Sequence, residues 1–593
     1  MQIIIPTSFA TVMLAAAISL FLLPGRHNLR KKLTDRYAIL AAILMLFATG
    51  IAVHLPLYAA DPESGGSFLA AFVLSVHHTL RLFVLDGEMT VAFEYGNTLS
   101  SGLRGWYLTV ATLTYVTCPI LTFRAVLSVV TDVSADWALF THRNAEKYVF
   151  SEVDTRAVAL AHSIREKEPQ ATIVFTNGGL RDSETDEELR RQVREMGAIL
   201  YRNDICTLPL KQSCKTTIFL ISEDENENVR KALHLMRQYG NAQLFVLYVF
   251  SCDPASELLF QKCETPGMRV RRVNETKTLV HSILFTAGYH LFEDAVCPPQ
   301  EKGDKLISAV ILGLGDHGMQ FLKDLTWFGQ MEGYELRITA FDKEQGKTEH
   351  LMAQCPEMMS PQINGKKVPG EAQYTLNVYD ETDVFSTRYQ QIVENLPAVT
   401  YAFISLGEDS RNIQAAVGLR EMCERNGWKP YIQAAASGSE QANSLEGISN
   451  FRGTKYDIHF IGGTDQLYSC DCIIRSELEQ LALKRHLLWG EEEDFWRYEY
   501  NHDSSVASAL HKQVKLMCHV PGAELPIAER TEEQREMLRV TEHRRWNAYM
   551  RSIGYRYSGS RDKSTRNDLA KLHHDLVPYG VLSEADRAKD DVE

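Results

Sequence analysis

Long apolar runs are confined to the first 132 residues of the chain. Residues 3–23 and 37–60 are each long enough to cross a bilayer core of about 30 Å, which takes about 20 apolar residues in a helix. Residues 105–130 form a third run of the same kind. The hydrophobic pattern therefore predicts an α-helical transmembrane domain over residues 1–132.

A fourth apolar stretch, residues 68–88, carries three polar residues within little more than one helical turn: His77, His78 and Arg81. Ionisable residues at membrane depth commonly mark a functional pathway. Here they either line a water-filled pathway or contact lipid headgroups, or they snorkel to the interface of an ordinary span. Both interpretations remain open.

After residue 132 the pattern changes to short apolar strands that alternate with amphipathic helices, and the pattern repeats. TTIFLISEDENENVRKALHLM (216–236) matches TYAFISLGEDSRNIQAAVGLREM (400–422), and each copy holds an asparagine after an acidic turn, Asn228 or Asn412. Such alternation predicts parallel βαβ units with right-handed crossovers. We therefore predict two doubly wound parallel-sheet domains, over residues 145–295 and 304–472.

The second unit opens with Gly313, Gly315 and Gly318 in G-x-G-x-x-G spacing, between a strand and a helix. This spacing brings backbone amides against a phosphate, and Asp342 ends the next strand, where an acid pairs with ribose hydroxyls. The first unit has SEVDTR (151–156) instead, whose side chains would crowd and repel a pyrophosphate. The second unit is therefore predicted to bind a nucleotide, and the first to be a degenerate copy. The alternative is that the glycines only allow tight packing of the strand and the helix.

The glycine opening, together with ISLGEDSRNIQAAVGLRE (404–421), resembles the TrkA-N or RCK type of Rossmann domain. The resemblance implies a cytoplasmic domain that binds NAD(H) or another nucleotide, or an ion, and controls a channel or transporter. By position it marks Gly313, Gly315, Gly318 and Asp342 as ligand contacts. Asp316 and Ser405 would be their neighbours.

The orientation of the membrane domain follows from five lysines and arginines in the loop at 24–36, which favour a cytoplasmic position. Four full crossings from there would put the C-terminal part outside, although its free cysteines and its glycine loop belong inside. We therefore expect residues 68–88 to be re-entrant or interfacial, leaving three spans, unless the first loop is not cytoplasmic. The prediction is a multi-pass protein of the plasma (inner) membrane with cytoplasmic C-terminal domains.

The last part of the chain, residues 477–593, has a different character. TEHRRWNAYMRSIGYRYSGSRD (541–562) predicts an amphipathic helix that ends at Gly554. KLHHDLVPYGVLSEADRAKDD (571–591) predicts a helix start with Ser583 as N-cap and Asp586 three residues later. The region is therefore predicted to be a helical linker followed by a small helical domain.

The two stretches resemble the RyR domain, the small helical repeat of ryanodine receptors that also occurs in bacterial proteins. The resemblance implies a ligand-sensing module for nucleotide-derived messengers. Aromatic rings there could stack on a base, and arginines could meet phosphate oxygens; alternatively the rings are core and the arginines a solvated face. The candidate ligand residues are His543, Arg545, Trp546, Tyr555, Arg556 and Tyr557.

Composition and motifs narrow the function further. A formal net charge of −14 argues against broad nucleic-acid binding, which needs a basic face. The sequence has no nucleophile elbow, H-E-x-x-H or Walker A motif, and no metal site is expected: on a helix the adjacent His573 and His574 would diverge. We therefore predict no catalytic residues and no resident metal.

These patterns together predict a membrane protein whose RCK-like and RyR-like domains sense a nucleotide-like ligand and gate a pore or membrane effector. Ligand binding would bias the membrane helices between two states, which requires different affinities for the two. Membrane lipid and a second copy of the chain are the expected partners, since such channels are usually symmetric oligomers. The RyR resemblance suggests bacterial (antiviral) defence or stress signalling. Alternatives are a membrane-anchored NAD(P)-dependent oxidoreductase and a membrane scaffold with empty Rossmann domains.

Overall fold

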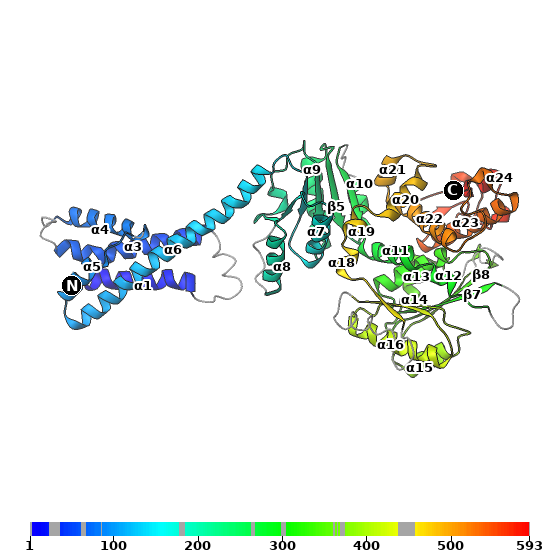
Figure 1. Ribbon diagram of the computed structural model, residues 1–593, viewed down its shortest axis with the longest axis horizontal. Helices are drawn as coiled ribbons and strands as arrows, with labels where there is room; N and C mark the ends of the chain where they lie inside the picture. Colours follow the sequence, from blue (N-terminus) through cyan, green and yellow to red (C-terminus); the bar gives the residue numbers. More distant parts are fainter. Residues whose placement is uncertain are drawn as a thin grey trace. The chain divides into compact units, whose positions relative to one another are not determined.

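In the computed structural model the chain forms two units (Figure 1). The first unit spans Met1–Arg143, and the second consists of Asn144–Gly178 and Ser183–Glu593. The structure describes residues 3–22, 36–60, 67–84, 86–176, 184–261, 267–297, 304–359, 362–363, 366–367, 374–436 and 457–591.

The first unit is helical. Its helices are α1 (Ile4–Leu22), α3 (Arg36–Ala60), α4 (Phe68–Phe83), α5 (Met89–Asn97) and α6 (Ser101–Thr141). Among the described residues one helical segment, Ala41–Ala60, is long and apolar enough to cross a membrane, and the apolar helices Ile4–Ala17 and Phe68–Phe83 are shorter. The helical fold agrees with the sequence pattern, whereas its place in a membrane stays a prediction. Nearly all of the basic loop at 24–36 lies outside the described residues.

Polar contacts join the helices of this unit. His54 in α3 contacts the hydroxyl of Tyr115 in α6 through Nε2 at 2.9 Å. The ring of His78 in α4 lies 5.0 Å from that of Tyr58 in α3. Arg81, at the end of α4, is paired with Asp86 at 3.0 Å. Of the polar residues in the 68–88 stretch, His78 therefore faces a neighbouring helix, whereas Arg81 is bound close to its own helix end.

The second unit contains two six-stranded parallel sheets. The first consists of β1 (Lys147–Phe150), β2 (Thr172–Phe175), β3 (Ile199–Leu200), β4 (Thr216–Leu220), β5 (Phe245–Phe250) and β6 (Arg269–Val273). The second consists of β7 (Lys305–Leu312), β8 (Tyr334–Phe341), β11 (Tyr374–Tyr379), β12 (Tyr401–Ile404), β13 (Tyr431–Ala435) and β14 (Ile458–Ile461). The strand orders, β3-β2-β1-β4-β5-β6 and β11-β8-β7-β12-β13-β14, are equivalent, and both follow the 3-2-1-4-5-6 order of dinucleotide-binding folds. The prediction of two doubly wound parallel sheets is confirmed.

Helices cover both faces of each sheet. The main ones are α7 (Thr155–Lys167), α8 (Glu184–Glu195), α9 (Glu225–Tyr239), α10 (Ala255–Gln261), α11 (Glu275–Ala287), α13 (Asp316–Phe328), α14 (Lys347–Gln354), α15 (Thr387–Glu394) and α16 (Asp409–Arg425). In β7, Ala309 and Ile311 pack under α11 and α13, whereas Val310 and Leu312 pack with α15 and α16 on the other face (Figure 1). A strand that is buried on both sides has no polar face, which is why β7 reads as one continuous apolar run.

The recurring asparagine has the same position in both sheets. Asn228 donates from Nδ2 to the carbonyl oxygens of Ser222, after β4, and Phe250, at the end of β5. Asn412 accepts from the amide of Leu406, after β12, at 2.6 Å and donates to the carbonyl of Ala435, at the end of β13, at 2.8 Å. Each buried amide thus ties the carboxyl ends of two neighbouring strands together.

The two sheet domains exchange their last segments. Helix α11 follows β6 of the first sheet, but its Leu279, Val280 and Ile283 share the core of the second domain with α13. In return, α18 (Thr464–Leu467) and α19 (Cys470–Ile473) follow β14 and pack against α7 of the first domain. The boundaries drawn from sequence at 295 and 472 therefore divide the chain, but they do not divide the hydrophobic cores.

The C-terminal module, residues 477–593, is mostly helical. It contains α20 (Glu477–His486), α21 (Glu492–Arg497), α22 (Glu499–Met517), α23 (Glu532–Ser552) and α24 (Glu584–Arg587), with the short strands β15 (Arg556–Tyr557) and β16 (Leu572–His573). Gly554, just after α23, has a φ of +92°, and Ser583 caps α24 by accepting a hydrogen bond from the amide of Asp586. Both helix boundaries match the prediction. Helix α23 packs on α13, so the module and the second sheet domain share one core.

Candidate functional site

The six residues predicted around the glycine loop (residues 313–318) lie at one edge of the second sheet. Gly313, Gly315, Asp316 and Gly318 follow β7, Asp342 follows β8 and Ser405 follows β12. Strand β7 lies between β8 and β12, so the strand order reverses here and the connections leave toward opposite faces. Ligands of open α/β sheets bind in the crevice at such a point.

The three glycines have different reasons to be glycine. Gly313 has a φ of +91°, and a Cβ there would overlap the carbonyl oxygen of Ser405. A Cβ on Gly318 would overlap the carbonyl oxygen of Gly313. Gly315 has an ordinary φ of −69°, and a Cβ built on it has no heavy atom of the described residues within 4 Å. Packing therefore explains Gly313 and Gly318, but it leaves Gly315 unexplained.

The two sheet domains differ at the start of the helix that follows the first strand. Helix α7 has Asp154 as its N-cap, and this carboxylate accepts a hydrogen bond from the amide of Ala157 at 2.6 Å. Helix α13 has Gly315 as its N-cap, with no side chain to accept the first-turn amides. Asp154 thus corresponds in structure to Gly315. A sequence alignment without gaps would pair Asp154 with Asp316 instead, because the loop after β1 is one residue longer than the loop after β7.

The loop of the first domain is filled by its own charges. Arg156 pairs with Asp154 at 2.9 Å and with Glu275, from α11, at 3.2 Å. The hydroxyl of Tyr468 donates to the same Glu275 carboxylate. A carboxylate already stands where an anion would meet the helix start, which agrees with the interpretation of a degenerate copy.

The carboxylate of Asp342 supports the glycine loop. Its Oδ2 accepts from the amide of Leu314 at 2.6 Å, and its Oδ1 accepts from the amide of Glu344 at 2.8 Å. Pairing of Asp342 with a ribose stays a prediction, but its support of the loop is a further role. Ser405 donates its amide to the carbonyl of Leu312 at 2.8 Å. Asp316 is exposed at the first helical position, where the helix dipole stabilises a negative charge.

The six candidate residues of the C-terminal module do not share one surface. His543 is buried, with Nε2 at 2.8 Å from the carbonyl oxygen of Val577, and Arg545 is buried against Glu542 at 2.9 Å. Tyr555 is buried too, and its hydroxyl donates to Asp568 at 3.2 Å. These three contacts are structural.

The other three candidates lie nearer the surface. The Trp546 ring lies 4.9 Å from that of His573. Arg556 is exposed, whereas Tyr557 packs partly against the core. A ligand of this module could reach Arg556, and ligand binding by the whole set stays a prediction.

His573 and His574 lie on β16 and the turn after it rather than on a helix, so the expectation that they diverge is wrong. Their rings stack at 4.7 Å with only 12° between the planes. Together with Asp575 they form a buried group of three metal-ligand types. Nearly parallel rings do not aim their lone pairs at one point, and Arg561 already binds the Asp575 carboxylate at 2.8 Å. The geometry fits a metal ion poorly.

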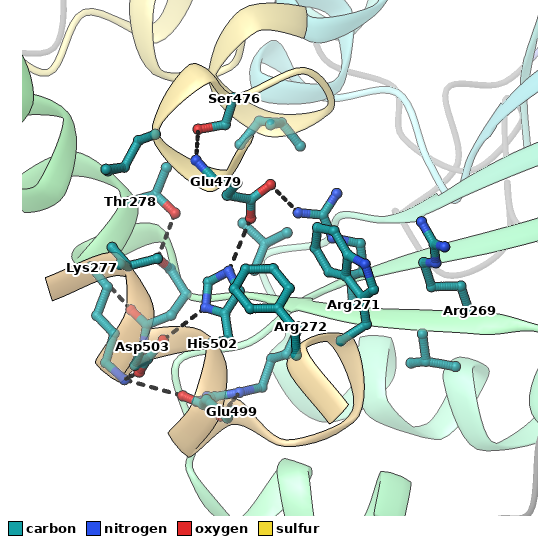
Figure 2. Close-up of a pocket in the computed structure, with 18 of the residues that line it drawn as sticks. Arg269, Arg271, Arg272, Lys277, Thr278, Ser476, Glu479, Glu499, His502 and Asp503 are labelled. Atoms are coloured by element: carbon teal, nitrogen blue, oxygen red, sulfur yellow. Dashed lines mark hydrogen bonds and ion pairs between the residues drawn. The ribbon is translucent and has the colours of Figure 1, made fainter. Parts of the chain in front are cut away.

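A pocket of about 1260 Å³ lies in the second unit between the edge of the first sheet and the C-terminal module. Its walls come mainly from α10, β6, α11 and α20 to α22, with further residues of α18 and α19, and Figure 2 shows the charged side chains that meet across it. The sequence patterns did not predict this pocket. The available signal was the run RVRRV, because three arginines on one short strand need an unusual environment.

No protein-family model matches the chain, and the comparison with curated proteins finds no match.

Proposed function

We propose that the chain is a membrane-bound sensor in which a nucleotide-type ligand at the glycine loop biases the helical N-terminal unit between two states. The output would be a pore or another membrane effector, with the RCK-like and RyR-like domains on the cytoplasmic side. NAD(H) or another nucleotide would serve as a regulatory ligand and not as a substrate.

The observation that carries this proposal is the open space at Gly315. Two glycines of the motif are required by packing, whereas the third has an unstrained backbone and a Cβ position that no described residue approaches, at an uncapped helix start. A missing side chain at that point allows a phosphate to approach the first-turn amides. The apolar helices of the first unit support the membrane part of the proposal, with Ala41–Ala60 as its strongest span.

The contrast between the two sheet domains gives the variant that tests ligand binding. Gly315→Asp introduces the N-cap that α7 has, which suits the helix start but repels a phosphate. We expect the full chain in detergent to be stabilised by NADH, NAD⁺ or an adenine nucleotide, by about 2.7 kcal/mol at a hundredfold excess over Kd. Gly315→Asp should keep the thermal midpoint of the free protein and lose this ligand shift.

Gly418→Asp is the matched control, because Gly418 is an exposed glycine within α16 with an equally empty Cβ position. It should retain the ligand shift. Absence of any shift in the parent protein would contradict the sensor and favour a scaffold. Steady consumption of NADH, followed by its absorbance, would favour the oxidoreductase. If the full chain in liposomes gives no ligand-dependent leakage, the proposed pore is ruled out.

A further inference from the structure

The charges around the pocket are divided between its two sides. The cations come from β6 and the first turn of α11: Arg269, Arg271, Arg272 and Lys277. The carboxylates that meet them come from α20, α21 and α22 of the C-terminal module: Glu479, Glu492, Glu499 and Asp503. The surface formed by β6 and the first turn of α11 is thus mainly basic and the helices that face it are mainly acidic, although Glu257 of α10 and Arg497 of α21 also line the pocket.

Each cation of the basic side has a partner across the junction. Arg271 pairs with Glu479, and Arg272 pairs with Glu499 (Figure 2). Lys277 reaches Glu499 at 3.1 Å and also contacts Asp503.

At the pocket rim Arg269 lies 3.5 Å from Glu492. The ring of Trp496 lies against two of the guanidinium groups, 4.4 Å from that of Arg271 and 5.2 Å from that of Arg269. The contacts of β6 with the module are therefore mainly ionic or cation–π, whereas α11 also packs on the module through the apolar core.

His502 holds the acidic side in position. Its Nε2 lies 3.2 Å from Glu479 and its Nδ1 lies 3.0 Å from Asp503, so one imidazole links carboxylates of α20 and α22 (Figure 2). Both partners belong to the C-terminal module. His502 is therefore a positioning residue that fixes two carboxylates opposite Arg271 and Lys277.

The module is attached to its two neighbours by different forces. It shares a continuous apolar core with the second sheet domain, in which Trp327 of α13 meets Tyr549 of α23. It meets the edge strand of the first sheet through ion pairs around a pocket, whose side chains are mostly buried. Separating an apolar core exposes surface that water solvates poorly, whereas separated charges beside a pocket recover their hydration. The two attachments therefore respond differently to salt and to loss of charge.

We propose that the ion pairs between the arginines of β6 and the carboxylates of α20 to α22 form a reversible latch, which opens while both sheets and the module stay folded. Helix α11 links the latch to the glycine loop, because Lys277 in its first turn contacts Glu499, the partner of Arg272, and its later turns pack on α13, whose N-cap is Gly315. That link to a ligand rests on the proposed function, but the latch itself does not.

The test is hydrogen–deuterium exchange of the full chain at constant pH without any nucleotide. The variant Glu479→Gln/Glu499→Gln/Asp503→Asn keeps the shapes of the side chains and removes three charges, which leaves the basic side to repel itself. We expect the β6 amides that are not bonded to β5, and the amide of Glu499, which donates to Glu257 across the junction at 3.2 Å, to exchange about tenfold faster, as a loss of about 1.4 kcal/mol gives. Raising salt from about 0.1 M to about 1 M shortens the screening length from about 10 Å to about 3 Å and should have the same effect on the parent protein.

The matched control is Glu524→Gln/Glu529→Gln/Glu533→Gln, which neutralises three exposed carboxylates of the same module that do not line the pocket. It should leave the exchange of β6 unchanged. Unchanged exchange at β6 in the latch variant would overturn the proposal. So would an equal loss of protection in α23 and β7, because the charges would then support the fold as a whole. Since no nucleotide is present, neither result depends on whether the glycine loop binds one.

Discussion

At the scale of single residues, identical amino acids carry different requirements. Gly313 and Gly318 are fixed by backbone geometry and by contact with carbonyl oxygens, whereas Gly315 is free of both. Asp342, predicted as a ribose partner, also holds the loop through the amide of Leu314. No sequence pattern singles out His502, but in the structure its imidazole contacts two carboxylates.

The titration of His502 gives a pH prediction. Burial lowers the pKa of His502, but its hydrogen bonds to Asp503 and Glu479 outweigh burial and raise the pKa from 6.5 to about 9. Because the folded pKa is above the unfolded one, this stabilisation is complete below pH 6.5 and is lost as the pH rises through about 9. The charged groups that face His502 or its carboxylate partners are Glu479, Asp503, Arg271 and Lys277. The carboxyl pKa of Glu479 is lowered to about 2, so Glu479 stays ionised throughout this window.

Relative to His502→Gln, we expect the free energy of unfolding of the parent protein to fall by about 1 to 2 kcal/mol between pH 6.5 and pH 9, a figure that allows for partial exposure of the imidazole. The measurement is the difference between the thermal midpoints of the two proteins across this range. Lys515, whose pKa burial lowers to about 8, titrates in both proteins and cancels. A difference that does not change with pH would contradict a charged His502.

At the scale of secondary-structure elements, the repeat determines which contacts recur. Both sheets have the same strand order, and both use one buried asparagine to join the ends of the fourth and fifth strands. The helix starts have diverged, with Asp154 capping α7 and Gly315 leaving α13 uncapped. The contacts that hold the sheet are thus kept, while those at the crevice differ.

The recurring asparagines predict equal effects in the two domains. Asn228→Ala and Asn412→Ala each remove the buried side chain that joins the carboxyl ends of two strands, so each should destabilise its own domain by about 1 to 3 kcal/mol. Domain-resolved hydrogen exchange will show which sheet loses protection. Asn203→Ala, at an exposed asparagine, should change stability by less than about 0.5 kcal/mol. If either buried variant matches this control, the shared role is refuted.

At the scale of the whole second unit, the exchanged segments and the shared core decide what moves together. Helix α11 joins the first sheet to the core of the second domain, and α23 joins the C-terminal module to the same core. The ionic junction at β6 is the contact of the module that lacks such a core. Any rearrangement is therefore expected to move the module with the second domain.

This grouping predicts the effect of a single core substitution. Trp327 is fully buried in α13 and meets Tyr549 of α23 edge to face at 6.1 Å. Trp327→Ala should lower the free energy of unfolding by about 3 to 5 kcal/mol. Hydrogen exchange should show α13 and α23 losing protection together, while α9 of the first domain keeps its own. Loss of protection in α13 alone would mean that the module is an independent domain.

The sequence by itself determined the two parallel sheets, because apolar runs of strand length that alternate with amphipathic helices leave few other ways to bury both faces of β7. It also determined the helix ends at Gly554 and Ser583, where capping depends only on neighbouring residues. The six residues around the glycine loop could be grouped in advance, since parallel strands bring their carboxyl ends to one edge. Contacts between distant segments could not be predicted, because no local pattern indicates which surface a helix will pack against.

Only the tertiary structure therefore decided that α11 belongs to the neighbouring core, that His543 and Arg545 are buried, and that the arginines of β6 face the carboxylates of α20 to α22. The sequence specifies each charge, but its partner is set by how the chain folds back, more than two hundred residues later for Arg271 and Glu479.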